Sequence, residues 1–170
     1  MKIQTCALPT GSRIIQSQPG ADFADCHRFA NTRPKASALE SYLALIAHTP
    51  NWMNTLMDLR NQVVRLVGLK HLGALNAFDA SKPASAYQIG DRVGIFNLSH
   101  MQSNEVILDD NDKHLHAQVS LFKHEVLGQP VLSISTVVHI HNRLGRVYMR
   151  VVGPVHQRII PLMLAQAARG

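Results

Sequence analysis

The segment between residues 113 and 141 alternates apolar and polar side chains, and this alternation constrains the fold more than any other feature of the chain. A period of two residues is typical of a β-strand that buries one of its faces. The pattern predicts two long strands, Lys113–His124 and Pro130–His141, joined by a tight turn at Leu127-Gly128. The two strands should therefore form one long antiparallel hairpin.

The register of this hairpin follows from the turn. If residue 126 is paired with residue 129, Val119 lies opposite Thr136 and Ala117 lies opposite Val138. Both apolar rows then share one face of the hairpin, which we expect to point into the protein. The other face carries polar side chains and should contact water: Gln118, Ser120, Ser133 and Ser135.

Two helical patterns precede the strands. A capping box at Ser37 and Glu40 predicts the start of a first helix, which ends at Thr49-Pro50. A second helix should begin at the same place, with Thr49 as its N-cap, and end at Gly68. The stripe of this helix that is expected to face the core consists of Trp52, Leu56, Leu59, Val63 and Leu66.

The C-terminal residues return to a helical period after Asn142, which is a suitable N-cap. Pro154 should kink or break this helix. Its apolar stripe consists of Leu144, Val147, Tyr148, Val151, Val155, Ile159 and Met163. Two shorter strands are predicted at Arg92–Leu98 and Asn104–Asp109, so the strands form one block with the helices before and after it. Segregation of this kind predicts an α+β fold.

A length of 170 residues suits one domain. Pro and Gly near the N-terminus predict an extended arm over residues 1–20, with an edge strand at Arg13-Ile14-Ile15, followed by a single domain over residues 21–170. The sequence shows neither a signal peptide nor an apolar run of membrane-spanning length, so we expect a cytoplasmic protein that does not bind membranes. Cys6 and Cys26 should then be free thiols.

The net charge of +6 and the isoelectric point near 9.8 raise the question of nucleic-acid binding. Lysines and arginines are scattered along the chain, however, and aromatic residues make up only 5% of it. Both features argue against nucleic acid as a partner, because such partners need clustered charge and stacking side chains.

The glycine loops that bind dinucleotides and phosphates are absent from the sequence, as are the motifs of serine hydrolases and zinc peptidases, so no cofactor is predicted. The ten histidines are unusual. Those on the polar face of the hairpin should lie close together without binding a metal: His114, His116, His139 and His141. His156 follows Pro154 in the last helix, where it either caps carbonyls freed by the proline or serves as a proton donor or anion contact at a cavity mouth.

Four stretches together resemble the bacterial DUF2867 family, whose function is unknown: Trp52–Gly68, Gly90–Phe96, Asp112–Leu121 and Thr136–His156. The resemblance covers most of residues 20–168. It implies a helix-grip-like fold, in which a curved antiparallel sheet wraps around the long C-terminal helix and leaves an apolar cavity. It also implies that related domains occur behind NAD(P)-binding, short-chain-dehydrogenase-like domains. His116-Ala117-Gln118 departs from the family pattern, in which we expect an acidic or aromatic residue before an arginine.

The resemblance transfers no catalytic residues, so the function rests on the expected cavity. The leading hypothesis is a module that binds a small apolar or amphipathic ligand between the sheet and the C-terminal helix. The residues expected to line this cavity are Phe96, Ala117, Val119, Thr136, Val138, Tyr148, Val151 and His156.

Two alternatives stay open. The first is a cyclase, hydratase or hydrolase that uses the same cavity, with Tyr148, His156 and Arg146 as its polar groups. The second is a non-catalytic interaction protein whose interior is filled by its own side chains. The sequence does not decide between them, and it leaves a homodimer open.

Overall fold

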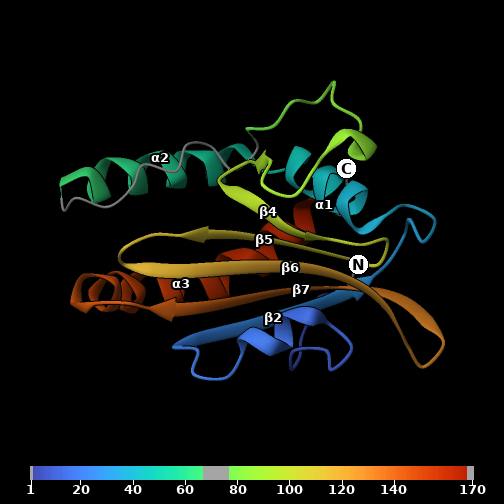
Figure 1. Ribbon diagram of the computed structural model, residues 1–170, viewed down its shortest axis with the longest axis horizontal. Coiled ribbons are helices and arrows are strands. Elements are labelled where there is room, and N and C mark those ends of the chain that lie inside the picture. Colours follow the sequence, from blue (N-terminus) through green and yellow to red (C-terminus); the bar gives the residue numbers. More distant parts are fainter. Residues whose placement is uncertain (1, 67–76, 168–170) are drawn as a thin grey trace.

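The computed structural model describes residues 2–66 and 77–167, which form an α+β fold (Figure 1). Seven strands make one curved sheet in the order β1-β2-β7-β6-β5-β4-β3, and all neighbouring strands are antiparallel. The strands are β1 (Gln4–Thr5), β2 (Phe23–Ala30), β3 (Arg92–Val93), β4 (Phe96–Met101), β5 (Glu105–Asn111), β6 (Leu115–Val126) and β7 (Gln129–Ile140). The predicted fold class, with a long C-terminal helix and two helices before the main strands, is confirmed.

β6 and β7 form the predicted hairpin in the predicted register, with Val119 opposite Thr136. The turn residues Leu127 and Gly128 have φ angles of 52° and 74°. A two-residue turn with positive φ at both positions matches the right-handed twist of the flanking strands. The turn therefore fixes which residues of the two strands lie opposite one another.

β2 lies beside β7 and is not predicted by the sequence pattern. Its residues that face the helices include two polar ones, so the apolar alternation that identifies a strand is interrupted. Backbone pairing with β7 places Asp25 opposite Thr136. The row of β2 on this face consists of Phe23, Asp25, His27 and Phe29.

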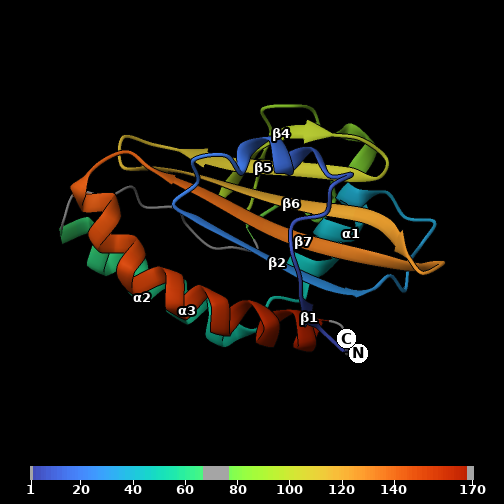
Figure 2. The ribbon, with the colours of Figure 1, turned by 90° about the horizontal axis from the view of Figure 1, so that it is seen from below.

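The N-terminal segment covers the face of the sheet opposite the helices (Figure 2). It contains a 3₁₀-helix, η1 (Arg13–Ser17), whose Ile14 is fully buried. The predicted edge strand over Arg13-Ile14-Ile15 is therefore wrong. Ile14 packs with Leu8, Cys26, Ile107 and Val137 in a second apolar cluster.

The polar face of the hairpin is buried beneath this segment, and the prediction that it contacts water is wrong. Ser120 and Ser135 are both fully buried. The reason is the carboxylate of Glu105, which is itself 3% exposed. It accepts hydrogen bonds from the hydroxyls of Ser12 and Ser120, so small polar side chains serve here to hold the N-terminal segment on the sheet.

The first helix, α1 (Ala38–Ala47), begins with the predicted capping box: Ser37 Oγ accepts from the Glu40 amide, and Glu40 Oε2 accepts from the Ser37 amide. Thr49 is not the N-cap of the second helix, because its hydroxyl donates to the Ile46 carbonyl at 2.6 Å and so closes α1. The second helix, α2 (Asn51–Leu66), follows. Its predicted end at Gly68 and the side chains of Val63 and Leu66 lie outside the described residues.

The last helix, α3 (Arg143–Ala167), has the predicted N-cap, since Asn142 Oδ1 accepts from the Gly145 amide at 3.1 Å. The helix continues through Pro154 and Pro161, so the expected break at Pro154 does not occur. Pro154 lies on the exposed side, where water can bind the carbonyl that loses its helical partner. None of the described helices is both long enough and apolar enough to span a membrane.

Candidate functional site

α3 approaches the sheet through glycines. A Cβ atom at Gly145 would lie 2.3 Å from the backbone oxygen of His114, so glycine is required for this close approach. At Gly153 a Cβ atom would make an ordinary contact with the Phe23 ring at 3.6 Å. His156 follows Gly153 by about one turn, on the same side of the helix. Docking of α3 therefore carries the His156 imidazole onto β2.

Asp25, His27 and His156 form a polar cluster where α3 meets β2. Asp25 Oδ2 lies 3.1 Å from His156 Nδ1 and 3.7 Å from His27 Nε2. The side chains of Asp25 and His27 are 6% and 3% exposed, whereas that of His156 is 23% exposed. The Phe23 ring meets the His156 ring edge-on at 5.7 Å between centroids. The cluster therefore reaches from the interior to a solvent-accessible imidazole.

Three polar atoms of this cluster are buried without a hydrogen-bonding partner among the described residues: Asp25 Oδ1 and both ring nitrogens of His27. An unmade hydrogen bond of a buried group costs about 1–3 kcal/mol, so such atoms are rare in folded proteins. Burial lowers the pKa of His27 and outweighs the opposing effect of the Asp25 charge, so this ring is neutral at pH 7. The cluster thus contains buried polar atoms that no described residue hydrogen-bonds.

The bond to Asp25 fixes the chemical role available to His156. When Nδ1–H donates to the carboxylate, Nε2 keeps a lone pair that accepts a proton or a hydrogen bond. An imidazole that a carboxylate orients in this way is suited to general acid–base chemistry. Of the two roles considered for His156, capping of carbonyls near Pro154 is wrong, because the ring binds Asp25 instead.

The hairpin places several predicted lining residues on the face that carries this cluster. Val119 and Thr136 lie in one row with Asp25, and Ala117 and Val138 form the next row. Thr136 and Val138 are buried, whereas Ala117 and Val119 are partly exposed although they lie on the central strand of the sheet. The middle of this face is therefore not fully covered. Phe96 and Tyr148, on β4 and α3, are partly exposed as well.

Only part of the predicted apolar stripe of α3 is buried, since Met163 is 5% exposed and Ile159 packs against the main core. Val147, Val151 and Val155 are 59%, 66% and 45% exposed. The side of α3 that is buried contains Gly145 and Gly153 instead. Helical periodicity identifies the apolar side of a helix, but here the glycine side permits the closest approach of the backbone to the sheet.

α2 also leaves part of its predicted stripe exposed. Leu56 and Leu59 are 39% and 56% exposed, while Met53 is only 3% exposed. Trp52 is partly buried, and its Nε1–H donates to Gln166 Oε1 at 3.0 Å. This bond joins the first turn of α2 to the C-terminal part of α3.

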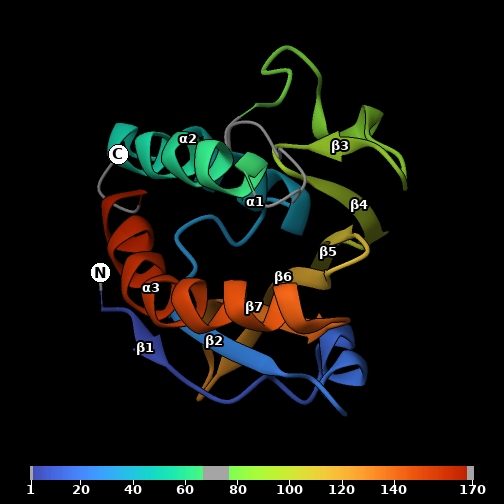
Figure 3. The same cartoon turned by 90° about the vertical axis from the view of Figure 1, so that its left-hand side faces the viewer.

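The bond between Trp52 and Gln166 shows which sides of the two helices face one another. Leu56 and Leu59 follow Trp52 on the same side of α2, and Val155 precedes Gln166 by three turns on the same side of α3. Figure 3 shows the helices close together near the end of α3 and farther apart toward its start. Exposed apolar side chains of both helices therefore border the same region.

The four hairpin histidines do not converge on one point. His116 and His139 are cross-strand partners, as predicted. Each ring nevertheless has its own partner: His114 with Asn142, His116 with Asp109, His139 with the Ser17 carbonyl and His141 with the Asp112 carbonyl. Across residues 2–66 and 77–167, no group of three His, Cys, Asp or Glu side chains is arranged to hold a metal ion.

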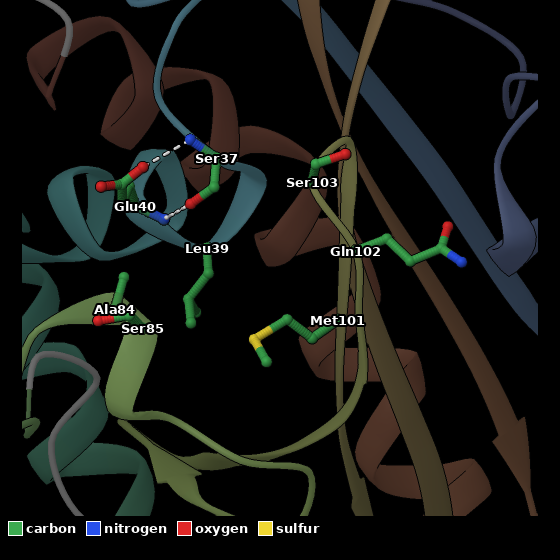
Figure 4. A pocket seen from close by; sticks show the side chains of 8 residues that line it. All are labelled: Ser37, Leu39, Glu40, Ala84, Ser85, Met101, Gln102 and Ser103. Atoms are coloured by element: carbon green, nitrogen blue, oxygen red, sulfur yellow. Dashed lines mark hydrogen bonds between the residues drawn. The ribbon is translucent and has the colours of Figure 1, made fainter.

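A surface pocket of about 430 Å³ lies between the start of α1 and the turn from β4 to β5 (Figure 4). Its lining residues are Ser37, Leu39, Glu40, Ala84, Ser85, Met101, Gln102 and Ser103. Ser37 and Glu40 already bind one another in the capping box. None of the predicted lining residues borders this pocket, and it lacks a group with the chemistry of His156.

Asp25 and His27 are the site residues that sequence reasoning missed. The available signal was their spacing of two residues within a segment bounded by Phe23 and Phe29. In a strand this spacing places all four side chains on one face, so two polar groups stand in an apolar row. Such a pair indicates a buried polar cluster once the segment is recognised as a strand.

The protein is an α+β domain whose polar cluster lies at the contact between helix and sheet. Three features define this class: the curved sheet, the long helix that docks on it through glycines, and the Asp–His–His cluster between them. The particular family follows from comparison. The model of the family described as "Protein of unknown function (DUF2867)" matches residues 17–163, and the chain belongs to this family. The predicted resemblance is confirmed. No curated protein matches the chain.

Proposed function

We propose that this domain binds an amphipathic small molecule between α2, α3 and the helix-facing side of the sheet. The observation that carries the proposal is the pair of exposed apolar stripes on the facing sides of the two helices. Leu59 on α2 and Val155 on α3 are 56% and 45% exposed. Apolar side chains that border one region favour an apolar occupant, because removing their surface from water is favourable by about 25 cal/mol per Å².

The sheet supports the same assignment. Ala117 and Val119 lie on its central strand and remain partly exposed, so a bound molecule has apolar surface to contact beneath the helices. The polar cluster lies in the same row as Val119, two strands away through Thr136. An apolar region with one polar group at its side suits a ligand with an apolar body and a polar head.

The test is titration with N-phenyl-1-naphthylamine, a neutral apolar dye that fluoresces when it leaves water. We expect saturable binding with a dissociation constant in the micromolar range, about −8 kcal/mol. Val151 lies one turn before Val155 and is 66% exposed, so Val151→Trp should fold normally while filling part of the region. We expect this variant to bind the dye at least tenfold more weakly.

Gln157→Trp is the matched control, since Gln157 is exposed on a different side of the same helix. It adds the same indole without entering the region between the helices, and it should bind the dye as the wild type does. Equal dye affinity in the wild type and in Val151→Trp would exclude this region as the binding site. A dimer that dissociates in Val151→Trp would instead assign the stripes to contact between two copies of the chain.

A further inference from the structure

His156 is placed as a general base would be placed. Its Nδ1 binds a carboxylate that is 6% exposed, while the imidazole itself is 23% exposed and keeps Nε2 for a reactant. We propose that His156 is the general base, and Asp25 its positioning residue, in the hydrolysis of an aliphatic ester by water. This inference rests on the binding function proposed above, because the ester is the amphipathic ligand.

A purely structural anchor would account poorly for this cluster. A buried carboxylate loses its hydration, and replacing a buried polar pair with apolar side chains often costs nothing in stability. Anchoring would also be expected to satisfy every polar atom, yet Asp25 Oδ1 and His27 Nδ1 have no hydrogen-bonding partner among the described residues, and His27 Nε2 approaches Asp25 Oδ2 only to 3.7 Å. A partly exposed imidazole held by a buried carboxylate is, in contrast, what acid–base catalysis requires.

His27 contributes by remaining neutral. Its Nε2 lies 3.7 Å from Asp25 Oδ2, close enough to compete for the carboxylate if the ring were charged. Burial lowers the pKa of His27, so it carries no charge at pH 7 and does not neutralise Asp25. The shorter contact of Asp25 is with His156 Nδ1, at 3.1 Å, so the carboxylate orients this ring.

The sheet sets the distance between partly exposed apolar surface and this base. Asp25, Thr136 and Val119 lie opposite one another on three successive strands. Neighbouring strands are about 4.8 Å apart, so Val119 lies about 10 Å from Asp25. An acyl chain of medium length spans that distance. Because Thr136 between them is buried, the proposed chain passes over the side chains that cover it, with its apolar end at the partly exposed Val119 and its ester group beside His156.

Water is the nucleophile in this scheme. The structure gives His156 two partners in the described chain, the Asp25 carboxylate and the Phe23 ring, and neither is a hydroxyl or thiol nucleophile. His156 Nε2 takes one proton from water as the water oxygen bonds to the ester carbonyl carbon. The adduct then collapses, the bond from that carbon to the alkoxy oxygen breaks, and the same proton passes to the departing alcohol. Ester and water thus give acid and alcohol.

The test measures release of p-nitrophenolate from p-nitrophenyl octanoate. General-base catalysis contributes about 10²–10⁴-fold, so His156→Ala should lower kcat at least a hundredfold, and imidazole in the buffer should restore part of the lost rate. Asp25→Asn should lower kcat at least tenfold with little change in KM, because it changes the orientation of the base and not the binding of the chain. Circular dichroism verifies that each variant is folded.

His48→Ala is the matched control. His48 is exposed and, like His156, is bound through Nδ1, but its partner is the Ala44 carbonyl and not a carboxylate. This variant should keep the wild-type rate, which separates the proposed site from the weak esterase activity of surface histidines. His156→Gln provides a second replacement that fills more of the imidazole volume, and it should lose the same activity.

The outcomes separate this inference from the binding function. If the dye binds but hydrolysis is unchanged in His156→Ala and His156→Gln, the catalytic pair is refuted and the binding function stands. A rate that falls in His156→Ala without any response to imidazole also refutes it, because that result describes a structural loss. If the dye does not bind the wild type, the binding function is refuted and the placement of the ester falls with it.

Discussion

Replacing Gly145 with alanine should destabilise the domain more than replacing Gly153 with alanine. Both glycines lie on the buried side of α3, yet a Cβ atom meets different surroundings at each. At Gly145 it would be 2.3 Å from the His114 oxygen and 3.1 Å from Ile140 Cγ2, where real Cβ contacts are essentially never under 3.0 Å. The oxygen belongs to the backbone, so the helix must move away from the sheet. At Gly153 the nearest atoms, in the Phe23 ring, are 3.6 Å away.

The magnitudes follow from two opposing terms. Overpacking of this kind costs about 1–3 kcal/mol, while alanine in place of glycine within a helix gains about 0.5–1 kcal/mol. Gly145→Ala should therefore lower the free energy of unfolding by about 1–2 kcal/mol, which lowers Tm by roughly 2–8 °C in a chain of this size. Gly153→Ala lacks this overpacking, but Gly153 precedes Pro154, whose Cδ crowds a Cβ atom on the preceding helical residue and offsets the gain from alanine. It should therefore lower the free energy of unfolding by less than Gly145→Ala does.

Urea unfolding followed by circular dichroism measures both effects, provided that the dependence on urea concentration is the same for each variant. Each variant serves as the control for the other, because the substitution and the helix are the same. The reasoning is refuted if Gly145→Ala is as stable as the wild type. The reasoning is also refuted if Gly153→Ala lowers the free energy of unfolding as much as Gly145→Ala does. The effect of alanine would then not depend on the distance between its Cβ atom and the backbone of the sheet.

Three further perturbations have defined outcomes. Leu127→Asn should raise Tm, because Leu127 has a φ angle of 52° and asparagine tolerates this conformation better than leucine does. Leu127 is 98% exposed, so the substitution removes little packing. An unchanged or lower Tm would contradict this prediction. Oxidised glutathione should link Cys6 to Cys26, because their Sγ atoms are 3.3 Å apart. The partly exposed Cys6 should react first, since burial raises the pKa of Cys26 to about 12. An intact mass that does not decrease by two hydrogens would exclude the link. Stability should fall as the pH drops below 6.5, because burial lowers the pKa of His27 and His124 and the unfolded chain then binds more protons than the folded one. His27→Gln should make the fall in unfolding free energy from about pH 7 to about pH 5 less steep, and an equal slope would count against a buried neutral His27.

The sequence alone determined the parts of the fold that depend on neighbouring residues. The hairpin register follows from a two-residue turn and the alternation beside it, and β6 pairs with β7 as predicted. The capping box of α1 joins residues three positions apart, and it forms as predicted. These features are local, so their energetics are already present in a short segment of chain.

Only the tertiary structure decided the faces and the site. Periodicity shows that α3 has an apolar side, but its glycine side docks because the backbone of His114 lies close to Gly145. The serines of the hairpin look suited to water, yet the N-terminal segment buries them by binding Glu105. Which side of a helix or strand is buried depends on the distant segment that packs against it. The residues of one helix or strand do not show which segment that is.

The site depends on this long-range packing most of all. Asp25 and His156 are separated by 131 positions, and their contact exists because β2 pairs with β7 and α3 then crosses β2. The sequence indicated His156 as a candidate because it follows Pro154 in the last helix, but it did not indicate its partner Asp25. A pair of this kind is created when strand pairing and helix docking occur together, so the sequence supplied the imidazole and the folded chain supplied the carboxylate that orients it.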